Sequence, residues 1–161
     1  MAEINKEKGV CEIANDNSDG QVILSGNKPA LDEINLILKK NKKRSIFLPV
    51  SAPFHSSLMS PAAKNMESKI NNTNFKNPSV ELISNVTAEP VQDSEEIKNL
   101  LIKQIYSKVR WRESVLFMIN SGVSEFIEIG PGKVLSGLVK RISDKVLTKS
   151  INSVDDIKSL K

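Results

Sequence analysis

Hydrophobic positions in the first fifty residues predict the order strand, strand, helix, strand. Residues 10–14 alternate weakly and residues 21–25 form a second apolar run, with a cluster of turn-forming residues at 15–20 between them. After Pro29, which is favoured in a first helical turn, apolar side chains return every three or four residues, the period of one helix face: Leu31, Ile34, Ile37 and Leu38. Residues 45–50 are the next apolar run and the next predicted strand.

The rest of the chain alternates helix and strand with short connections. The pattern predicts helices over residues 58–70, 95–106, 111–121 and 133–142, with a last one from residue 154. It predicts strands over residues 80–85, 125–129 and 146–151. This alternation favours an α/β fold with a largely parallel sheet.

Length and composition narrow the class of protein. The chain has 161 residues, 39% of them hydrophobic, which is enough for one ordinary core. No apolar run approaches the roughly 20 residues that span a bilayer, and the first residues lack a signal-peptide core, so we expect a cytoplasmic protein without membrane association. Cys11 is the only cysteine and His55 the only histidine. An internal disulfide is thereby excluded, and a metal site is not expected.

The net charge of +4 is concentrated in one segment, formed by Lys39, Lys40, Lys42, Lys43 and Arg44. Two interpretations stay open. These cations are typical of a solvated helix end, where they complement the helix dipole, and they also suit a docking patch for an anionic partner. Nucleic acid is not an expected partner, because aromatic residues make up only 4% of the chain and none interleaves with these cations.

His55 is the first candidate for chemistry. It lies in a segment with Pro49 and Pro53, between a predicted strand and a predicted helix. Loops on a rigid scaffold often carry catalytic groups, and histidine changes charge near neutral pH, although a lone loop histidine is more often an ordinary polar residue. The chain contains no Gly-x-Ser-x-Gly nucleophile motif. Ser56 and Ser57 are expected to cap the following helix.

A second candidate motif is the turn Gly130-Pro131-Gly132-Lys133. It does not fit a phosphate-binding loop, which needs four residues between its first glycine and the Gly-Lys-Ser/Thr. A tight strand-to-helix turn, in which glycines permit close packing, is the favoured interpretation.

Four segments together resemble the malonyl-CoA:acyl-carrier-protein transacylase family. They are Leu-Pro-Val-Ser-Ala-Pro-Phe-His-Ser-Ser-Leu-Met at 48–59, Leu-Ile-Lys-Gln-Ile-Tyr at 101–106 followed by Val109-Arg110-Trp111, Glu-Ile-Gly-Pro-Gly-Lys-Val-Leu at 128–135 followed by Gly137-Leu138, and Asn-Ser-Asp-Gly-Gln-Val-Ile at 17–23. The resemblance runs from about residue 9 to residue 150. It implies a partial α/β-hydrolase-like acyltransferase core, residues 51–161, with the remnant of an inserted ferredoxin-like subdomain, residues 1–50.

The resemblance also implies a mechanism. His55 would be the general base that takes a proton from a serine hydroxyl, and the backbone carbonyl of Gln104 would orient its ring. Malonyl would pass from CoA to the serine and then to an acyl carrier protein, in two half-reactions with ping-pong kinetics. Malonyl-CoA and the phosphopantetheinyl carrier protein would be substrates, and no cofactor or metal is implied.

The sequence departs from the family in one important way. The family's nucleophile elbow, its glutamine-glycine oxyanion segment and its malonyl-binding arginine all precede the subdomain, and none is present here. The chain therefore resembles a C-terminal portion that we expect to be inactive alone. Three hypotheses follow: an enzyme half that pairs with a separate N-terminal half, an inactive remnant of a split or truncated gene, and a non-catalytic module that binds RNA or an acidic carrier protein. The last is the least favoured.

Overall fold

The computed structural model describes residues 8–158. Positions 1–7 of the predicted subdomain range 1–50 and positions 159–161 of the predicted core range 51–161 lie outside the described residues. None of the helices in the described part of the chain has the length and apolar character needed to cross a membrane.

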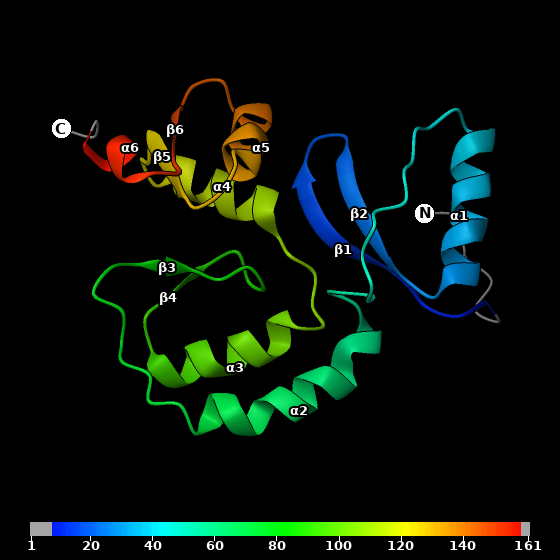
Figure 1. Cartoon of the computed structure of the whole chain (residues 1–161), viewed down its shortest axis with the longest axis horizontal. Helices are drawn as coiled ribbons and strands as arrows, with labels where there is room; N and C mark the ends of the chain where they lie inside the picture. Colours follow the sequence, from blue (N-terminus) through cyan, green and yellow to red (C-terminus); the bar gives the residue numbers. More distant parts are fainter. Residues whose placement is uncertain (1–7, 159–161) are drawn as a thin grey trace.

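The first part is a β-hairpin followed by a helix (Figure 1). Strands β1 (Cys11–Ser18) and β2 (Gln21–Gly26) pair antiparallel, and α1 (Lys28–Lys40) follows, as the pattern predicts. However, β1 extends through most of the predicted turn cluster, and the turn is confined to residues 19–20. The extension has a tertiary cause, because the Asp16 amide donates to the Val109 carbonyl at 3.0 Å and the Val109 amide donates to the Ala14 carbonyl at 2.8 Å.

The strand predicted at residues 45–50 is not formed. This segment has no regular secondary structure and leaves its apolar side chains in solvent, with Ile46 75% and Val50 61% exposed. A strand needs a neighbouring edge to satisfy its backbone groups. The described strands form three two-stranded sheets, and none of these strands pairs with this segment. An apolar run is therefore insufficient to make a strand here.

The middle part contains a short 3-10 helix, two α-helices and a small two-stranded sheet. The elements are the short 3-10 helix η2 (Ser57–Met59), α2 (Ser60–Asn71), β3 (Leu82–Ile83), β4 (Pro90–Val91) and α3 (Ser94–Gln104). Asp93 caps α3, and its side chain accepts from the Glu96 amide at 2.8 Å. Of the strand predicted at 80–85, only two residues pair, and the short partner β4 was not predicted.

The last part follows the predicted order closely. Its elements are α4 (Trp111–Asn120), β5 (Glu125–Ile129), α5 (Val134–Ile142), β6 (Leu147–Ile151) and α6 (Val154–Lys158). Helix α5 packs on β5, β6 and α4, and the fully buried Val115 of α4 and Val139 of α5 belong to this interior.

The prediction of a largely parallel sheet is wrong for the described residues. They form three separate two-stranded sheets, β1-β2, β3-β4 and β5-β6, and only the third is parallel. Alternation along the sequence fixes the order of elements but carries no information on which strands are neighbours. The mixed α/β content is confirmed, while the ferredoxin-like character of the first part stays a prediction.

An ion pair joins the first and last parts. Arg112 on α4 donates from Nε and Nη2 to the Asp16 carboxylate, at 3.1 and 3.0 Å, and from Nη1 to Asp19 at 2.9 Å. The Asp16 side chain is only 15% exposed, whereas Arg112 is 37% exposed, so solvent screens part of the attraction.

We expect Asp16→Asn to lower the free energy of unfolding by about 1 kcal/mol, because a charged hydrogen-bond acceptor is lost at a partly buried site. Urea denaturation followed by circular dichroism measures this. The matched control is Asp32→Asn, which removes the exposed Lys28–Asp32 pair on α1 and should cost less than about 0.5 kcal/mol. Equal losses in both variants would contradict a specific role for Asp16.

Candidate functional site

His55 lies where the segment after α1 meets the C-terminal end of α3. Its ring nitrogen Nδ1 is 2.9 Å from the backbone carbonyl oxygen of Gln104, although 49 residues separate the two positions. The structure thus brings together the two residues that the family resemblance selected. The contact is a geometric fact, while the catalytic roles of His55 and Gln104 stay predictions.

The position of Gln104 explains why its carbonyl is available. Gln104 is the last residue of α3, and the last four carbonyls of a helix have no partner within it. The following amides donate elsewhere, Ile105 to the Ile102 carbonyl and Tyr106 to the Lys103 carbonyl. A carbonyl oxygen only accepts, so Nδ1 of His55 must carry the proton in this hydrogen bond. In the neutral ring, Nε2 then has a free lone pair, which is the arrangement a proton acceptor needs.

The backbone of His55 is strained. Its φ is +57°, in the left-handed region that residues other than glycine rarely occupy. The next residue, Ser56, is fully buried and its hydroxyl donates back to the Pro53 carbonyl at 2.7 Å. Strained backbone of this kind persists where the surroundings determine it, and it is concentrated at functional sites.

The two serines after His55 do not cap the helix with their side chains, contrary to expectation. The Ser56 hydroxyl is used by Pro53, and no side-chain cap is formed at η2 or α2. Ser57 instead donates from its amide and its hydroxyl to the carboxylate of Glu12 on β1, at 2.7 and 2.8 Å. Sequence analysis did not select Glu12, because nothing local links residue 12 to residue 57.

The glycine turn after β5 has a different cause from the one expected. Gly130 and Gly132 have φ of +136° and +95°, but a side chain added at either would meet open space. Glycine is therefore required here by backbone conformation and not by close packing. The motif's acidic residue, Glu128, accepts hydrogen bonds from the amides of Leu135 and Ser136 at 3.0 and 2.8 Å. These bonds give partners to two backbone N–H groups in the first turn of α5.

These backbone donors, Ser136 foremost, hold the pKa of Glu128 below its usual value. A carboxyl whose pKa is lower in the folded state stabilises the fold above its unfolded pKa, roughly 4.3, and loses that contribution as pH falls through the folded pKa. We therefore expect Glu128→Gln to lower the melting temperature at pH 7. The difference from the unaltered chain should shrink as pH falls below about 4. Thermal melts across this pH range measure it, and a pH-independent difference would contradict the assignment.

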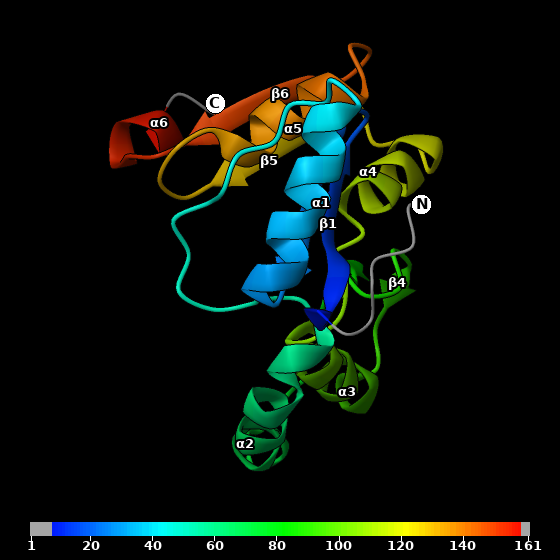
Figure 2. The ribbon, with the colours of Figure 1, turned by 90° about the vertical axis from the view of Figure 1, so that its right-hand side faces the viewer.

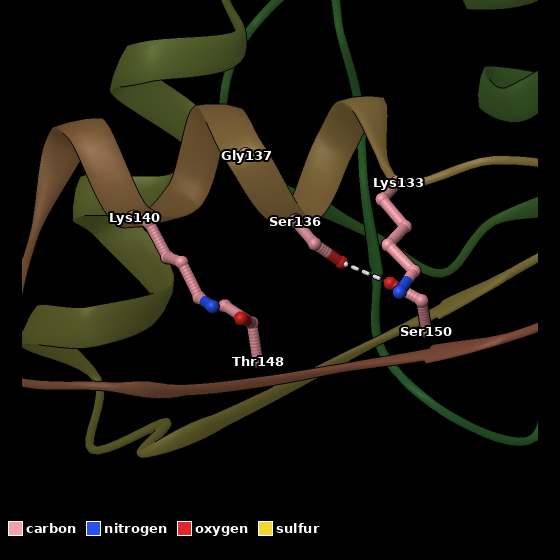
Figure 3. A pocket seen from close by; sticks show the side chains of 6 residues that line it. All are labelled: Lys133, Ser136, Gly137, Lys140, Thr148 and Ser150. Carbon is pink, nitrogen blue, oxygen red and sulfur yellow. Dashed lines mark hydrogen bonds between the residues drawn. The ribbon is translucent and has the colours of Figure 1, made fainter.

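Two cavities among the described residues are relevant to the site. The larger, about 260 Å³, lies between α5 and β6 and is lined by Lys133, Ser136, Gly137, Lys140, Thr148 and Ser150 (Figure 3). The Ser136 and Ser150 hydroxyls are hydrogen bonded across it at 2.9 Å, and neither His55 nor Gln104 lines it. The smaller, about 200 Å³, has mostly apolar walls from β3, β4 and α3 and includes Gln104. No cluster of metal-ligating side chains occurs among residues 8–158.

Comparison with known proteins gives a consistent result. No family model matches the chain. The malonyl CoA-acyl carrier protein transacylase of Bacillus subtilis is 41% identical over 155 residues, which are 96% of this chain and 49% of the relative. The enzyme of the same name from Staphylococcus aureus strain COL is 40% identical over 159 residues, 96% of this chain and 51% of the relative. The chain therefore spans about half the length of the curated relatives it matches.

Solved structures agree. The crystal structure of acyl-carrier-protein S-malonyltransferase from Bartonella henselae superposes with a TM-score of 0.91 at 41% identity, covering 96% of this chain and 49% of that one. A malonyl-transacylase in complex with a type II polyketide synthase acyl-carrier protein gives a TM-score of 0.90 at 34% identity, covering 96% and 50%. These extents are consistent with the C-terminal portion that the motifs indicate. By sequence and by fold, 96% of the chain matches about half the length of known malonyl-CoA:acyl-carrier-protein transacylases.

Proposed function

We propose that this chain is the C-terminal portion of a malonyl-CoA:acyl-carrier-protein transacylase and that it supplies the general base for a serine outside its own sequence. The observation that carries the proposal is the hydrogen bond from His55 Nδ1 to the Gln104 carbonyl. It holds the ring in the tautomer whose Nε2 accepts a proton. Gln104 is a positioning residue in this scheme, acting through its main chain.

The proposed reaction has two half-reactions. His55 Nε2 removes the proton from the serine hydroxyl as the serine oxygen bonds to the malonyl thioester carbonyl. The carbon–sulfur bond breaks, and the imidazolium returns its proton to the CoA thiolate. In the second half-reaction His55 takes the proton of the carrier protein's pantetheine thiol, whose sulfur displaces the serine. The serine oxygen recovers the proton, and malonyl leaves on the carrier protein.

The location of the acceptor suits this cycle. The C-terminal end of a helix carries partial negative charge from its unpaired carbonyls, and His55 contacts the last residue of the 11-residue α3. Charge of this sign stabilises the imidazolium formed midway through each half-reaction. The acceptor is neutral and cannot take the proton itself, so the ring remains the proton carrier.

The serine-bearing portion would dock on apolar surface that this chain leaves open. On β5 and β6, Ile129 is 82%, Leu147 67% and Ile127 45% exposed, and residues 46–50 add a second exposed apolar segment. Contiguous exposed apolar surface marks interaction sites. The matched relatives are about twice as long as this chain, so the remaining half of the enzyme is the partner that fits, on a separate polypeptide or on the same one.

The second partner in the proposal is an acyl carrier protein. A related transacylase has been solved in complex with its acyl-carrier protein, which supports the assignment by analogy. We propose that the chain acts in fatty acid biosynthesis. Its cytoplasmic location stays a prediction, as does a docking role for the cationic segment at residues 39–44.

The test is malonyl transfer from malonyl-CoA to holo acyl carrier protein by this chain mixed with the N-terminal half of the Bacillus subtilis relative. We expect transfer from the mixture and none from either half alone. A folded, associated mixture without transfer would contradict the proposal, and would favour the inactive-remnant hypothesis.

A further inference from the structure

We propose that Glu12 is a positioning residue for His55. Its carboxylate binds Ser57, two residues after His55, through two hydrogen bonds that together are called the clamp. This inference rests on the function proposed above. Its observable consequence, the protonation pattern of the His55 ring, can be measured without enzyme activity.

The clamp has two points of contact. The Ser57 amide donates to Oε2 of Glu12 at 2.7 Å, and the Ser57 hydroxyl donates to Oε1 at 2.8 Å. Both oxygens of the carboxylate are engaged, so the geometry of Ser57 is fixed in direction as well as in distance. Hydrogen bonds to a charged acceptor are shorter and about twice as strong as neutral ones.

Glu12 is held on a rigid support. It lies on β1, where it is the partner of Ser25 on β2 in the antiparallel register. The same strand is joined further along to residue 109 by two backbone hydrogen bonds. Figure 2 shows the start of α2 beneath one end of β1. The clamp joins β1 to η2, which directly precedes α2.

The segment before His55 needs such an anchor. Between α1 and η2 the chain has no helix or strand, and His55 itself holds a strained φ of +57°. Its ring is fixed on one side by the Gln104 carbonyl, and its backbone on the other by the clamped Ser57. When the clamp is removed, the backbone at His55 can relax from the left-handed region. The ring then moves away from the single acceptor that selects its tautomer.

The experiment is nitrogen NMR of the ring in the full chain labelled with ¹⁵N-histidine. His55 is the only histidine, so every ring signal belongs to it. In the unaltered chain we expect the neutral ring to be mainly protonated at Nδ1. In Glu12→Gln and Ser57→Ala we expect a mixture in which protonation at Nε2 rises several-fold.

Two further variants make the comparison specific. Ser57→Thr keeps both the amide and a hydroxyl, and should retain the pattern of the unaltered chain. Glu125→Gln removes a carboxylate that pairs with Lys149 on the β5-β6 sheet and should also leave the ring unchanged. If the ring pattern changed only because the chain is less stable, Glu125→Gln would change it as well. Ser57→Thr would then not retain the pattern of the unaltered chain.

Unchanged Nδ1 protonation in a folded Glu12→Gln chain would overturn the proposal. If that variant does not fold, Ser57→Ala decides, since it removes one contact and keeps the hydrogen bond from the Ser57 amide to Glu12.

In the assembled enzyme, Glu12→Gln should lower kcat roughly 10- to 100-fold with little change in KM, as expected for a displaced catalytic group. An altered ring pattern in an assembly without any malonyl transfer would contradict the proposed function and leave the clamp supported.

Discussion

A His55→Gln chain, assembled with the serine-bearing half of the enzyme, is expected to transfer malonyl about 10²–10⁴-fold more slowly than the unaltered assembly. The glutamine side chain keeps polarity and approximate size but cannot accept and return a proton at neutral pH. The loss should lie in kcat, because in the proposed mechanism the ring acts on the serine and thiol protons and not on substrate binding. Single-turnover and steady-state assays with malonyl-CoA and holo carrier protein measure it.

Gln104→Ala provides the matched comparison for this variant. The atom that contacts His55 is the backbone carbonyl oxygen of Gln104, which alanine also has. Its substitution should therefore cost far less than that of His55, although both residues belong to the same contact. A loss as large as that of His55→Gln would show that the side chain of Gln104 acts directly, and would contradict the assigned role.

The second large effect is expected from assembly itself. The chain alone should give no transfer above background, because it lacks a nucleophile motif. Addition of the N-terminal half of the Bacillus subtilis relative should raise the rate by roughly 10⁴–10⁶-fold, the scale on which serine-dependent acyl-transfer sites depend on their complete set of residues. The assay is transfer of labelled malonyl, titrated with the added half until the rate saturates.

A surface variant distinguishes assembly from catalysis. Ile129 on β5 is 82% exposed in this chain, and Ile129→Asp should raise the concentration of the added half needed for half-maximal rate. Leu36→Asp is the control, since Leu36 is 60% exposed on α1 and lies on neither β5 nor β6. If both variants need the same concentration of the added half for half-maximal rate, the docking surface does not include Ile129 on β5.

The sequence predicted the elements whose signals are local. Strand β5 has the predicted bounds, and α3 begins after Asp93 because an aspartate at that position accepts from the helix amides. Residues 45–50 show the limit of such signals, since a strand depends on a neighbour that hydrophobicity does not encode. The same limit applies to β1. Its hydrogen bonds to residue 109 extend the strand beyond residues 10–14, the range that the hydrophobic pattern predicts.

The candidate site was predictable only in part, for a related reason. His55 is conspicuous as the only histidine of the chain. Gln104 was reached only through the family resemblance, because a role played by a backbone carbonyl leaves no side-chain signature. Glu12 was missed, because its contact with Ser57 exists only once the folded chain brings β1 and η2 together.

Intact-mass spectrometry of the assembled halves, after incubation with malonyl-CoA and without carrier protein, tests the central claim most directly. The account predicts a malonyl adduct on the added half, none on this chain, and rapid formation only when His55 is present. An adduct on this chain itself, or equally fast labelling of the added half by the His55→Gln chain, would contradict it.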